Sequence, residues 1–183
     1  MKTYTKMQKE LLPDTLTQRI GILTRREVEA RIVAPLLDAL GERFGNDAVI
    51  ETVSQAIAEI ARRQGAELAK MLGGCGSMEF IAALEQWKED GALELEILRQ
   101  NEMHLDFNVT RCRYAEMYRK LGIQELGPVL SCNRDFALIR GFNPNARLKR
   151  TQTIMEGASF CDFRFVFEKS GQSEDVAGHP ETD

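Results

Sequence analysis

The chain has 183 residues, of which 43% are hydrophobic and 28% charged, with a formal net charge of −4. This length suits one domain with a core of ordinary size, and the composition is that of a soluble globular protein. The acidic balance gives no electrostatic case for nucleic-acid binding, which usually requires a basic face. No apolar run approaches the ~20 residues of a membrane span, so no membrane partner is expected.

The first residues, Met1 to Lys6, lack the apolar segment of a signal peptide. A cytoplasmic location is therefore expected. In that compartment the four cysteines (Cys75, Cys112, Cys132 and Cys161) are predicted to be thiols or ligands rather than disulfides. Cys75 lies among glycines after the second predicted helix, where we favour a loop cysteine over a reactive thiol.

Three helices are predicted in the N-terminal half. The first begins at Pro13-Asp14 and has apolar residues at helical spacing as far as Leu40. Pro35 falls inside that pattern and is expected to kink the helix or divide it in two. The second runs over residues 47–72 and the third over residues 78–88, with glycines between them.

From residue 91 the apolar period changes from 3.6 to 2. Residues 93–97 and 103–109 alternate between apolar and polar side chains, which predicts two strands joined by a turn near residues 99–101. Two helices follow, over residues 112–121 and 124–140, and then two strands over residues 148–155 and 160–167.

These elements predict an α+β fold, with a helical N-terminal half packed on an antiparallel sheet of about four strands and two intervening helices. We expect a single domain over residues 1–168. Residues 169–183 have the composition of a disordered tail.

The candidate site residues lie late in the chain. Cys132 and Asp135 are three residues apart on a predicted helix and share a face. Asp135 requires a partner if it points inward. In the last strand, Cys161 lies on the same side as three phenylalanines, whereas Asp162 and Arg164 lie on the other side. Each thiol could be a core residue or a reactive group.

Other chemistries find weaker support. Cys112, Cys132 and Cys161, with Asp135 or His104, could hold a zinc ion, but they lack the paired spacing usual for zinc. We therefore predict no metal or other cofactor and keep this zinc site as the alternative. The sequence has no Gly-x-Ser-x-Gly elbow, phosphate-binding loop or dinucleotide fingerprint.

Several segments together resemble the L-2-amino-thiazoline-4-carboxylic acid hydrolase family, over roughly residues 90–167. The most specific is Cys161-Asp162-Phe163-Arg164-Phe165 following Arg150-Thr151-Gln152-Thr153. The others are the following: Val109 to Glu116, Leu121-Gly122, Glu125 to Gly127, Cys132 to Asp135, Gly141 to Pro144 and Glu156-Gly157. The resemblance implies hydrolytic opening of a thiazoline ring to give N-carbamoyl-L-cysteine, a step in bacterial L-cysteine formation.

That reaction suits the residues present. A guanidinium such as Arg164, Arg150 or Arg134 could hold the substrate carboxylate, and Asp135 or Asp162 could stabilise the cationic ring or act on water. A cysteine could serve as proton donor or as nucleophile. We expect Cys132, Asp135, Cys161, Asp162 and Arg164 to border one pocket, with Cys112 and Arg150 near it.

Four catalytic candidates are thus predicted: Cys132, Asp135, Cys161 and Asp162. Five residues are expected to bind substrate: Arg164, Arg150, Thr153, Asn133 and Cys112. The alternative function is a small-molecule binding or sensor domain of similar architecture without turnover. The N-terminal helices carry enough apolar positions to serve a homo-oligomer interface as well as a core.

Overall fold

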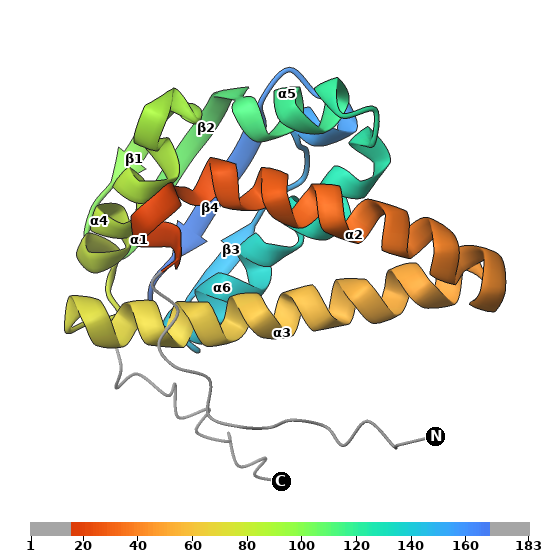
Figure 1. Cartoon of the computed structure of the whole chain (residues 1–183). Coiled ribbons are helices and arrows are strands. Elements are labelled where there is room, and N and C mark those ends of the chain that lie inside the picture. The colour runs from red at the N-terminus through yellow and green to blue at the C-terminus, as the bar shows by residue number, and fades with distance from the viewer. Residues whose placement is uncertain (1–15, 169–183) are drawn as a thin grey trace, which may run out of the picture.

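In a computed structural model, described here over residues 16–168, helices pack in front of a four-stranded antiparallel sheet (Figure 1). The strand order is β1-β2-β4-β3. This confirms the predicted α+β class. Within the described residues no helix is both long and apolar enough to cross a membrane. The expected helix start at Pro13 and the expected tail over residues 169–183 lie outside the described range.

The first helical region is divided at a glycine and not at the proline. Helix α1 covers Leu16–Ile20 and α2 covers Ile22–Phe44. Gly21 between them has a φ of 72°, a left-handed conformation that favours glycine. Of the two outcomes expected at Pro35, a kink or a division, the division is wrong, because α2 continues through Pro35. Pro35 is exposed, so its missing N–H group leaves no buried carbonyl without a partner.

The next two helices confirm their predictions closely. Helix α3 covers Asn46–Leu72 and ends at Gly73, which adopts a left-handed conformation and closes the last turn. Helix α4 covers Ser77–Lys88 and continues into a 3₁₀ turn, η1, at Glu89–Gly91.

The predicted hairpin is also present. Strand β1 covers Leu93–Gln100 and pairs antiparallel with β2, His104–Cys112. The turn is held by the side chain of Asn101, which accepts hydrogen bonds from the backbone N–H groups of Met103 and His104 at 3.0 and 2.8 Å. Helix α5, Arg113–Lys120, follows directly.

The single helix predicted over residues 124–140 is wrong. It consists of a 3₁₀ turn η2 (Gln124–Leu126), a π-helix η3 (Pro128–Cys132) and helix α6 (Arg134–Phe142). Pro128 has no N–H group to continue a regular ladder. Its carbonyl accepts the N–H of Asn133 at 2.8 Å, an i to i+5 bond typical of a π-turn.

The strand predicted over residues 148–155 is also too long. Strand β3 is only Arg147–Lys149, and a 3₁₀ turn η4 covers Ile154–Glu156. Between them, the backbone N–H groups of Thr151 and Gln152 donate to the carboxylate of Asp162 instead of to a neighbouring strand. A charged side chain thus replaces the ladder that the sequence pattern suggested.

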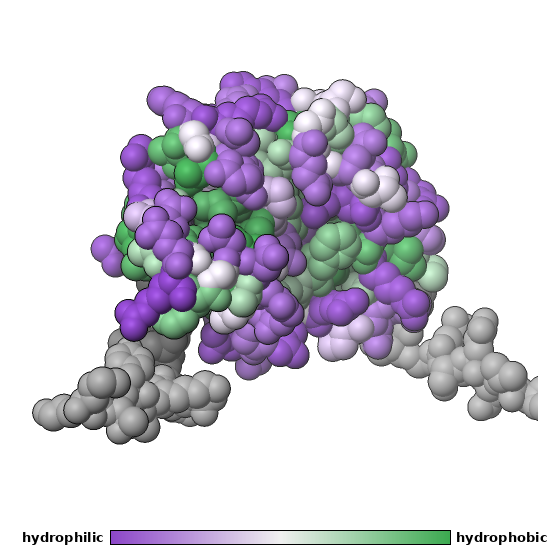
Figure 2. Space-filling view, turned by 90° about the vertical axis from the view of Figure 1, so that its right-hand side faces the viewer, coloured by the Kyte–Doolittle hydropathy of each residue, from purple (hydrophilic) through white to green (hydrophobic). Residues whose placement is uncertain are grey.

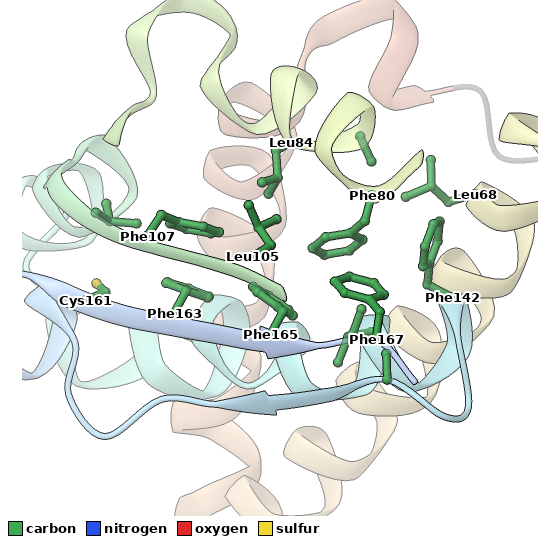
Figure 3. Close-up of a cluster of buried hydrophobic side chains, with 14 residues drawn as sticks. Leu68, Phe80, Leu84, Leu105, Phe107, Phe142, Cys161, Phe163, Phe165 and Phe167 are labelled. Atoms are coloured by element: carbon green, nitrogen blue, oxygen red, sulfur yellow. The ribbon is translucent and has the colours of Figure 1, made fainter. Parts of the chain in front are cut away.

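The core lies between the sheet and helices α3, α4 and α6. Strand β4, Cys161–Val166, alternates buried and half-buried residues, so its inward side is the predicted aromatic side. The rings of Phe107 and Phe163 stack with centroids 4.9 Å apart, and Phe80 packs on Phe165 at the same distance (Figure 3). This aromatic layer fixes the inward direction of Cys161.

Helices α3 and α6 cross in backbone contact. A Cβ atom on Gly65 would lie 2.1 Å from the carbonyl oxygen of Leu138, and one on Gly141 would lie 1.9 Å from the carbonyl oxygen of Arg62. Both distances are far below van der Waals contact, so each position requires glycine. The crossing therefore fixes α6, which carries two of the charged residues described next, close against α3.

Candidate active site

A cavity of about 190 Å³ lies between the helical layer and the sheet. Residues from α1, α2, α3 and α4 form one part of its wall, and residues from the sheet, α5, η3, α6 and the connection between β3 and β4 form the rest. The wall includes five of the residues that the sequence predicted for the site, namely Cys112, Cys132, Asp135, Arg150 and Cys161. Segments far apart in the chain thus meet around one cavity.

Asp135 and Arg150 form an ion pair on this wall, which gives Asp135 the partner that the sequence required. Arg150 also donates to the carbonyl of Cys132 at 3.1 Å. Its guanidinium lies between two rings, 5.0 Å from the centroid of Phe136 and 5.1 Å from that of Phe163. These contacts hold the guanidinium in one place, and its side chain is only 8% exposed.

The surroundings of Asp135 favour its protonated form, so it keeps its proton to a higher pH than an ordinary aspartate does. Burial raises the pKa of Asp135, and the positive charge and hydrogen bond of Arg150 act in the opposite direction. A carboxyl group with a raised pKa can exchange a proton with a bound molecule at a pH closer to neutrality. Asp135 is therefore the strongest acid–base candidate in the cavity.

Three thiols line the cavity beside this carboxyl group. Burial raises the pKa of Cys112 to about 11, and it also raises the pKa of Cys132 and of Cys161. The Cys112 sulfur accepts the N–H of Ala115 at the start of α5, and the Cys161 sulfur accepts the N–H of Ile154 at 3.2 Å. Neutral thiols are therefore the main form near pH 7, which disfavours a resting thiolate nucleophile.

A cluster of arginines forms another part of the wall. Glu29 contacts Arg25 at 2.9 Å, Arg26 at 2.5 Å and Arg134 at 3.9 Å. Burial opposes ionisation of Glu29, but the arginines outweigh it and lower the pKa of this carboxyl group. Three guanidiniums thus surround one carboxylate, and all three line the cavity. A surplus of positive charge on a poorly solvated cavity wall is costly, unless an anion binds there and balances it.

Arg134 is the most deeply buried of these cations. It is 4% exposed and donates one hydrogen bond to Gln64 at 3.0 Å, while its buried Nε has no hydrogen-bond partner among residues 16–168. Burial, reinforced by the charge of Arg26, lowers the pKa of Arg134 to about 10. Both features indicate that its charge is incompletely compensated by the protein itself.

Asp162 and Arg164 lie elsewhere, so the expectation that they border the same pocket is wrong. Both project from the opposite side of β4 from Cys161. Arg164 donates to the carbonyls of Phe107 and Phe163, each at 2.8 Å. The reason is the period of the strand, which turns alternate residues to opposite faces of the sheet.

Asp162 nevertheless connects to the cavity through the backbone. Its carboxylate accepts from the N–H and hydroxyl of Thr151 at 2.9 and 2.7 Å and from the N–H of Gln152 at 2.8 Å. These hydrogen bonds outweigh partial burial and lower the pKa of Asp162. They fix the segment immediately after Arg150, so Asp162 holds Arg150 in position without reaching the cavity.

Asn133 and Thr153 are also absent from the cavity wall. The Asn133 amide donates to the hydroxyl of Ser54 at 2.8 Å and to its carbonyl at 3.1 Å, which ties the start of α6 to α3. The hydroxyl of Thr153 accepts the N–H of Glu156 and caps η4. Within the described structure, their contacts are those of structural residues.

The predicted set omitted Arg26 and Gln64. Arg26 had a detectable signal, because it shares a helical face with Ala30, Ala34 and Leu37, all of which are buried. A charged residue on such a face requires a partner. Gln64 had no comparable signal, since a polar residue on a long amphipathic helix is ordinary.

No group of three or more histidine, cysteine, aspartate or glutamate side chains within residues 16–168 has the arrangement to hold a metal ion. Cys112, Cys132 and Cys161, the ligands of the zinc alternative, form no such group.

Together these features define an α+β protein whose helices and sheet border an arginine-rich cavity, with the half-buried Asp135 on its wall. The model of the L-2-amino-thiazoline-4-carboxylic acid hydrolase family matches residues 25–165, and the chain belongs to this family. The resemblance in the C-terminal half is thereby confirmed, and the match extends it through the N-terminal helices. None of the curated proteins compared with the chain matches it.

Proposed function

We propose that this protein hydrolyses L-2-amino-thiazoline-4-carboxylate to N-carbamoyl-L-cysteine in the cytoplasm. The observation that supports this most is the combination of two different environments on one cavity wall. Arg134, beside Arg26, supplies positive charge that its partners compensate incompletely, and Asp135 supplies a carboxyl group with a raised pKa. The substrate has matching ends, a carboxylate and a basic cyclic isothiourea.

In this proposal the substrate carboxylate binds Arg134 and Arg26. A guanidinium holds a carboxylate through two parallel hydrogen bonds, and burial strengthens such contacts. The carboxylate would complete the charge balance of the arginine cluster and so fix the ring within the cavity. This role belongs to Arg134 rather than to Arg164, because Arg164 lies on the other face of the sheet.

Asp135 is proposed to act at the ring carbon between sulfur and nitrogen. Its carboxylate form removes a proton from water as the oxygen bonds to that carbon, while the ring nitrogen carries its own proton. Collapse of the tetrahedral intermediate breaks the carbon–sulfur bond, and Asp135 returns its proton to the departing sulfur. The hydroxyl proton of the intermediate leaves to solvent as the carbonyl group of the product forms. One water is consumed, one carbon–oxygen bond forms, and no oxidant or metal is required.

In this proposal the three thiols bind the substrate and take no part in the proton transfers. Cys112, Cys132 and Cys161 line the same cavity, and their raised pKa values keep them neutral. In this proposal the sulfur of the bound ring faces them. Neutral sulfur is soft and polarizable, which suits contact with the ring sulfur. We therefore favour a binding surface over a covalent nucleophile.

The decisive experiment incubates the purified protein with L-2-amino-thiazoline-4-carboxylate and follows N-carbamoyl-cysteine by mass spectrometry. Direct detection of product avoids interference from Cys75, an exposed thiol that would react with a thiol dye. Asp135→Asn is expected to abolish turnover in a folded protein. Arg134→Gln is expected to raise KM by about 10- to 100-fold, the effect of one charge-assisted hydrogen bond, with a smaller effect on kcat.

Three results would contradict parts of this proposal. Full activity in Asp135→Asn would remove the acid–base role of that residue. An unchanged KM in Arg134→Gln would place the substrate carboxylate elsewhere. Saturable binding of the thiazoline by the wild-type protein, without product, would identify a binding domain instead of an enzyme.

A further inference from the structure

Two hydroxyl groups meet at the cavity wall and share a single hydrogen bond. The phenol of Tyr118, on α5, lies 3.1 Å from the hydroxyl of Ser131, in η3. Ser131 lines the cavity, whereas Tyr118 is 0% exposed and does not line it. Neither hydroxyl has a second hydrogen-bond partner among residues 16–168. Neither residue takes part in the proton transfers proposed above.

The number of protons decides the direction of this hydrogen bond. Each hydroxyl carries one proton and can accept at two lone pairs. If Ser131 donated, the proton of Tyr118 would have no acceptor at a position closed to solvent, which costs free energy. If Tyr118 donates, the remaining proton belongs to Ser131, which lines the cavity. Tyr118 is therefore the donor, and Ser131 presents its own O–H group to the cavity.

Tyr118 keeps the proton that it donates. Burial raises the pKa of this phenol, and the hydrogen bond to Ser131 and the nearby charge of Arg26 oppose the rise without outweighing it. The phenol is therefore neutral near pH 7. The charge of Arg134 also acts on it. The pair of hydroxyl groups thus lies beside the arginine cluster.

An unused hydroxyl proton is ordinary at the outer surface, where it donates to water. Hydrophilic side chains cover much of the face seen in Figure 2, and a hydroxyl group on such a face needs no partner from the protein. The wall around Ser131 is different, because it includes apolar residues such as Leu138 and Phe163. In a ligand pocket, a few polar groups on a mostly apolar wall fix the orientation of the ligand.

A second unused donor lies three residues further along the chain. The buried Nε of Arg134 has no hydrogen-bond partner within the described part of the chain, and Arg134 lines the same cavity. Two donors without acceptors on one wall indicate a ligand with more than one acceptor oxygen. The incompletely compensated charge of Arg134 indicates that this ligand is an anion. A carboxylate meets both requirements.

We propose that Ser131 donates a hydrogen bond to the carboxylate of the substrate and so selects thiazolines that carry this group, with Tyr118 as the residue that positions it. This inference rests on the proposed function, because it adds a contact to the same substrate. The amino group and the protonated nitrogen of the ring are hydrogen-bond donors, so neither can accept the proton of Ser131. The carboxylate can accept from Ser131 and Arg134 together.

Steady-state kinetics with the thiazoline carboxylate tests the role of Ser131. Ser131→Ala should raise KM by about 10-fold, the effect of one hydrogen bond to a charged group, with little change in kcat. The inhibition constant of 2-amino-2-thiazoline, a competitor that lacks the carboxylate, should not change. Ser131→Thr keeps the hydroxyl group and should restore most of the affinity for the carboxylate substrate.

Tyr118→Phe tests the positioning role and keeps the ring in the core. It should raise the same KM by a smaller factor than Ser131→Ala, because the hydroxyl of Ser131 remains but loses the donor that orients it. A residue that acts only through Ser131 has no effect in its absence. The double variant should therefore have the KM of Ser131→Ala alone, whereas an independent structural effect of Tyr118 would multiply the two changes.

A binding measurement separates this inference from the proposed function. Calorimetric titration of Asp135→Asn with the thiazoline carboxylate needs no turnover, and the addition of Ser131→Ala should weaken binding by about 10-fold. If the wild-type protein forms no product but Ser131→Ala weakens binding in this way, the contact stands and the hydrolysis fails.

Two results would overturn the contact while the hydrolysis stands. The first is product formation with the same KM in Ser131→Ala and the wild-type protein. The second is an equal loss of affinity for 2-amino-2-thiazoline, since that molecule has no carboxylate to accept the hydrogen bond. A wild-type protein that neither binds nor converts the thiazoline carboxylate would overturn both proposals.

Discussion

At the scale of single residues, the pair of Asp135 and Arg150 combines two opposing effects on one proton. Burial favours the protonated carboxyl group, and the guanidinium favours the carboxylate. In the proposed mechanism, this balance decides the pH at which Asp135 becomes available as a base. Arg150 would thus adjust the pKa of the proposed acid–base group without contacting the reacting atoms itself.

Removing the positive charge of Arg150 should move the pH dependence of the reaction upward. Wild-type kcat/KM should rise with pH through the pKa of Asp135, above the ordinary value of 3.8, because the carboxylate is the active form. Arg150→Gln removes the interaction that lowers this pKa, so the rising limb should shift to higher pH. A limb that stays in place, or moves to lower pH, would show that Asp135 does not set it.

The thiols allow a second test at this scale. Cys75 is exposed, whereas Cys112, Cys132 and Cys161 are at least partly buried with raised pKa values. Because the thiolate is the reactive form, a thiol reagent at neutral pH should modify one cysteine rapidly and the other three slowly. All four should react after unfolding. Rapid modification of two or more in the native protein, located by peptide mapping, would contradict neutral cavity thiols.

At the scale of elements, the segment between β3 and η4 owes its shape to one carboxylate. Asp162 accepts hydrogen bonds from the backbone N–H groups of Thr151 and Gln152 and thereby holds the neighbouring Arg150. Its position in the strand made it resemble a catalytic residue in the sequence. Its contacts make it a positioning residue instead.

Asp162→Asn should lower kcat by about 10- to 100-fold, because an amide group cannot accept all three donors and small misplacements near the reacting atoms cost this much. It should also shift the pH profile in the same direction as Arg150→Gln. Arg164→Gln, on the same face of β4, should leave KM nearly unchanged. A normal rate for Asp162→Asn, or a large rise in KM for Arg164→Gln, would restore the role that the sequence suggested.

The crossing of α3 and α6 gives a prediction about stability. Gly65→Ala would place a methyl group against the backbone of α6, so the helices must separate. We expect the free energy of unfolding to fall by about 1–3 kcal/mol, the usual cost of overpacking. Gln55→Ala, an exposed change on the same helix, should alter it by less than about 0.5 kcal/mol. Urea unfolding compares the two, and equal stability would mean that the contact relaxes without cost.

At the scale of the whole molecule, the sequence predicts the fold better than the site. Hydrophobic periodicity is a local property, and it located α3, α4, the β1–β2 hairpin and the inward side of β4. It failed where a side chain redirected the backbone, as Asp162 does beside β3 and Pro128 does before α6. A pattern of apolar residues contains no information on such hydrogen bonds.

The residues of the cavity also differ in whether the sequence could predict them. Cys132 and Asp135 could be grouped from their spacing, since both lie on one helical face. The arginine cluster could not, because Arg26 and Arg134 are more than a hundred residues apart in sequence and meet only when α2, α3 and α6 pack together. Pairing of distant charges is a tertiary property, and a single sequence without relatives does not reveal it.

The π-helix η3 limits how the length of this chain can change during evolution. A π-turn contains one residue more than an α-turn, and here the extra residue lies just before α6. Deleting one residue from Pro128–Cys132 would restore α-helical spacing and rotate the preceding segment by about 100° relative to α6. Ser131 and Cys132 would then leave the cavity wall, although the chain would be shorter by one position only. Deletions should therefore be far rarer in η3 than in the turn around Gly122.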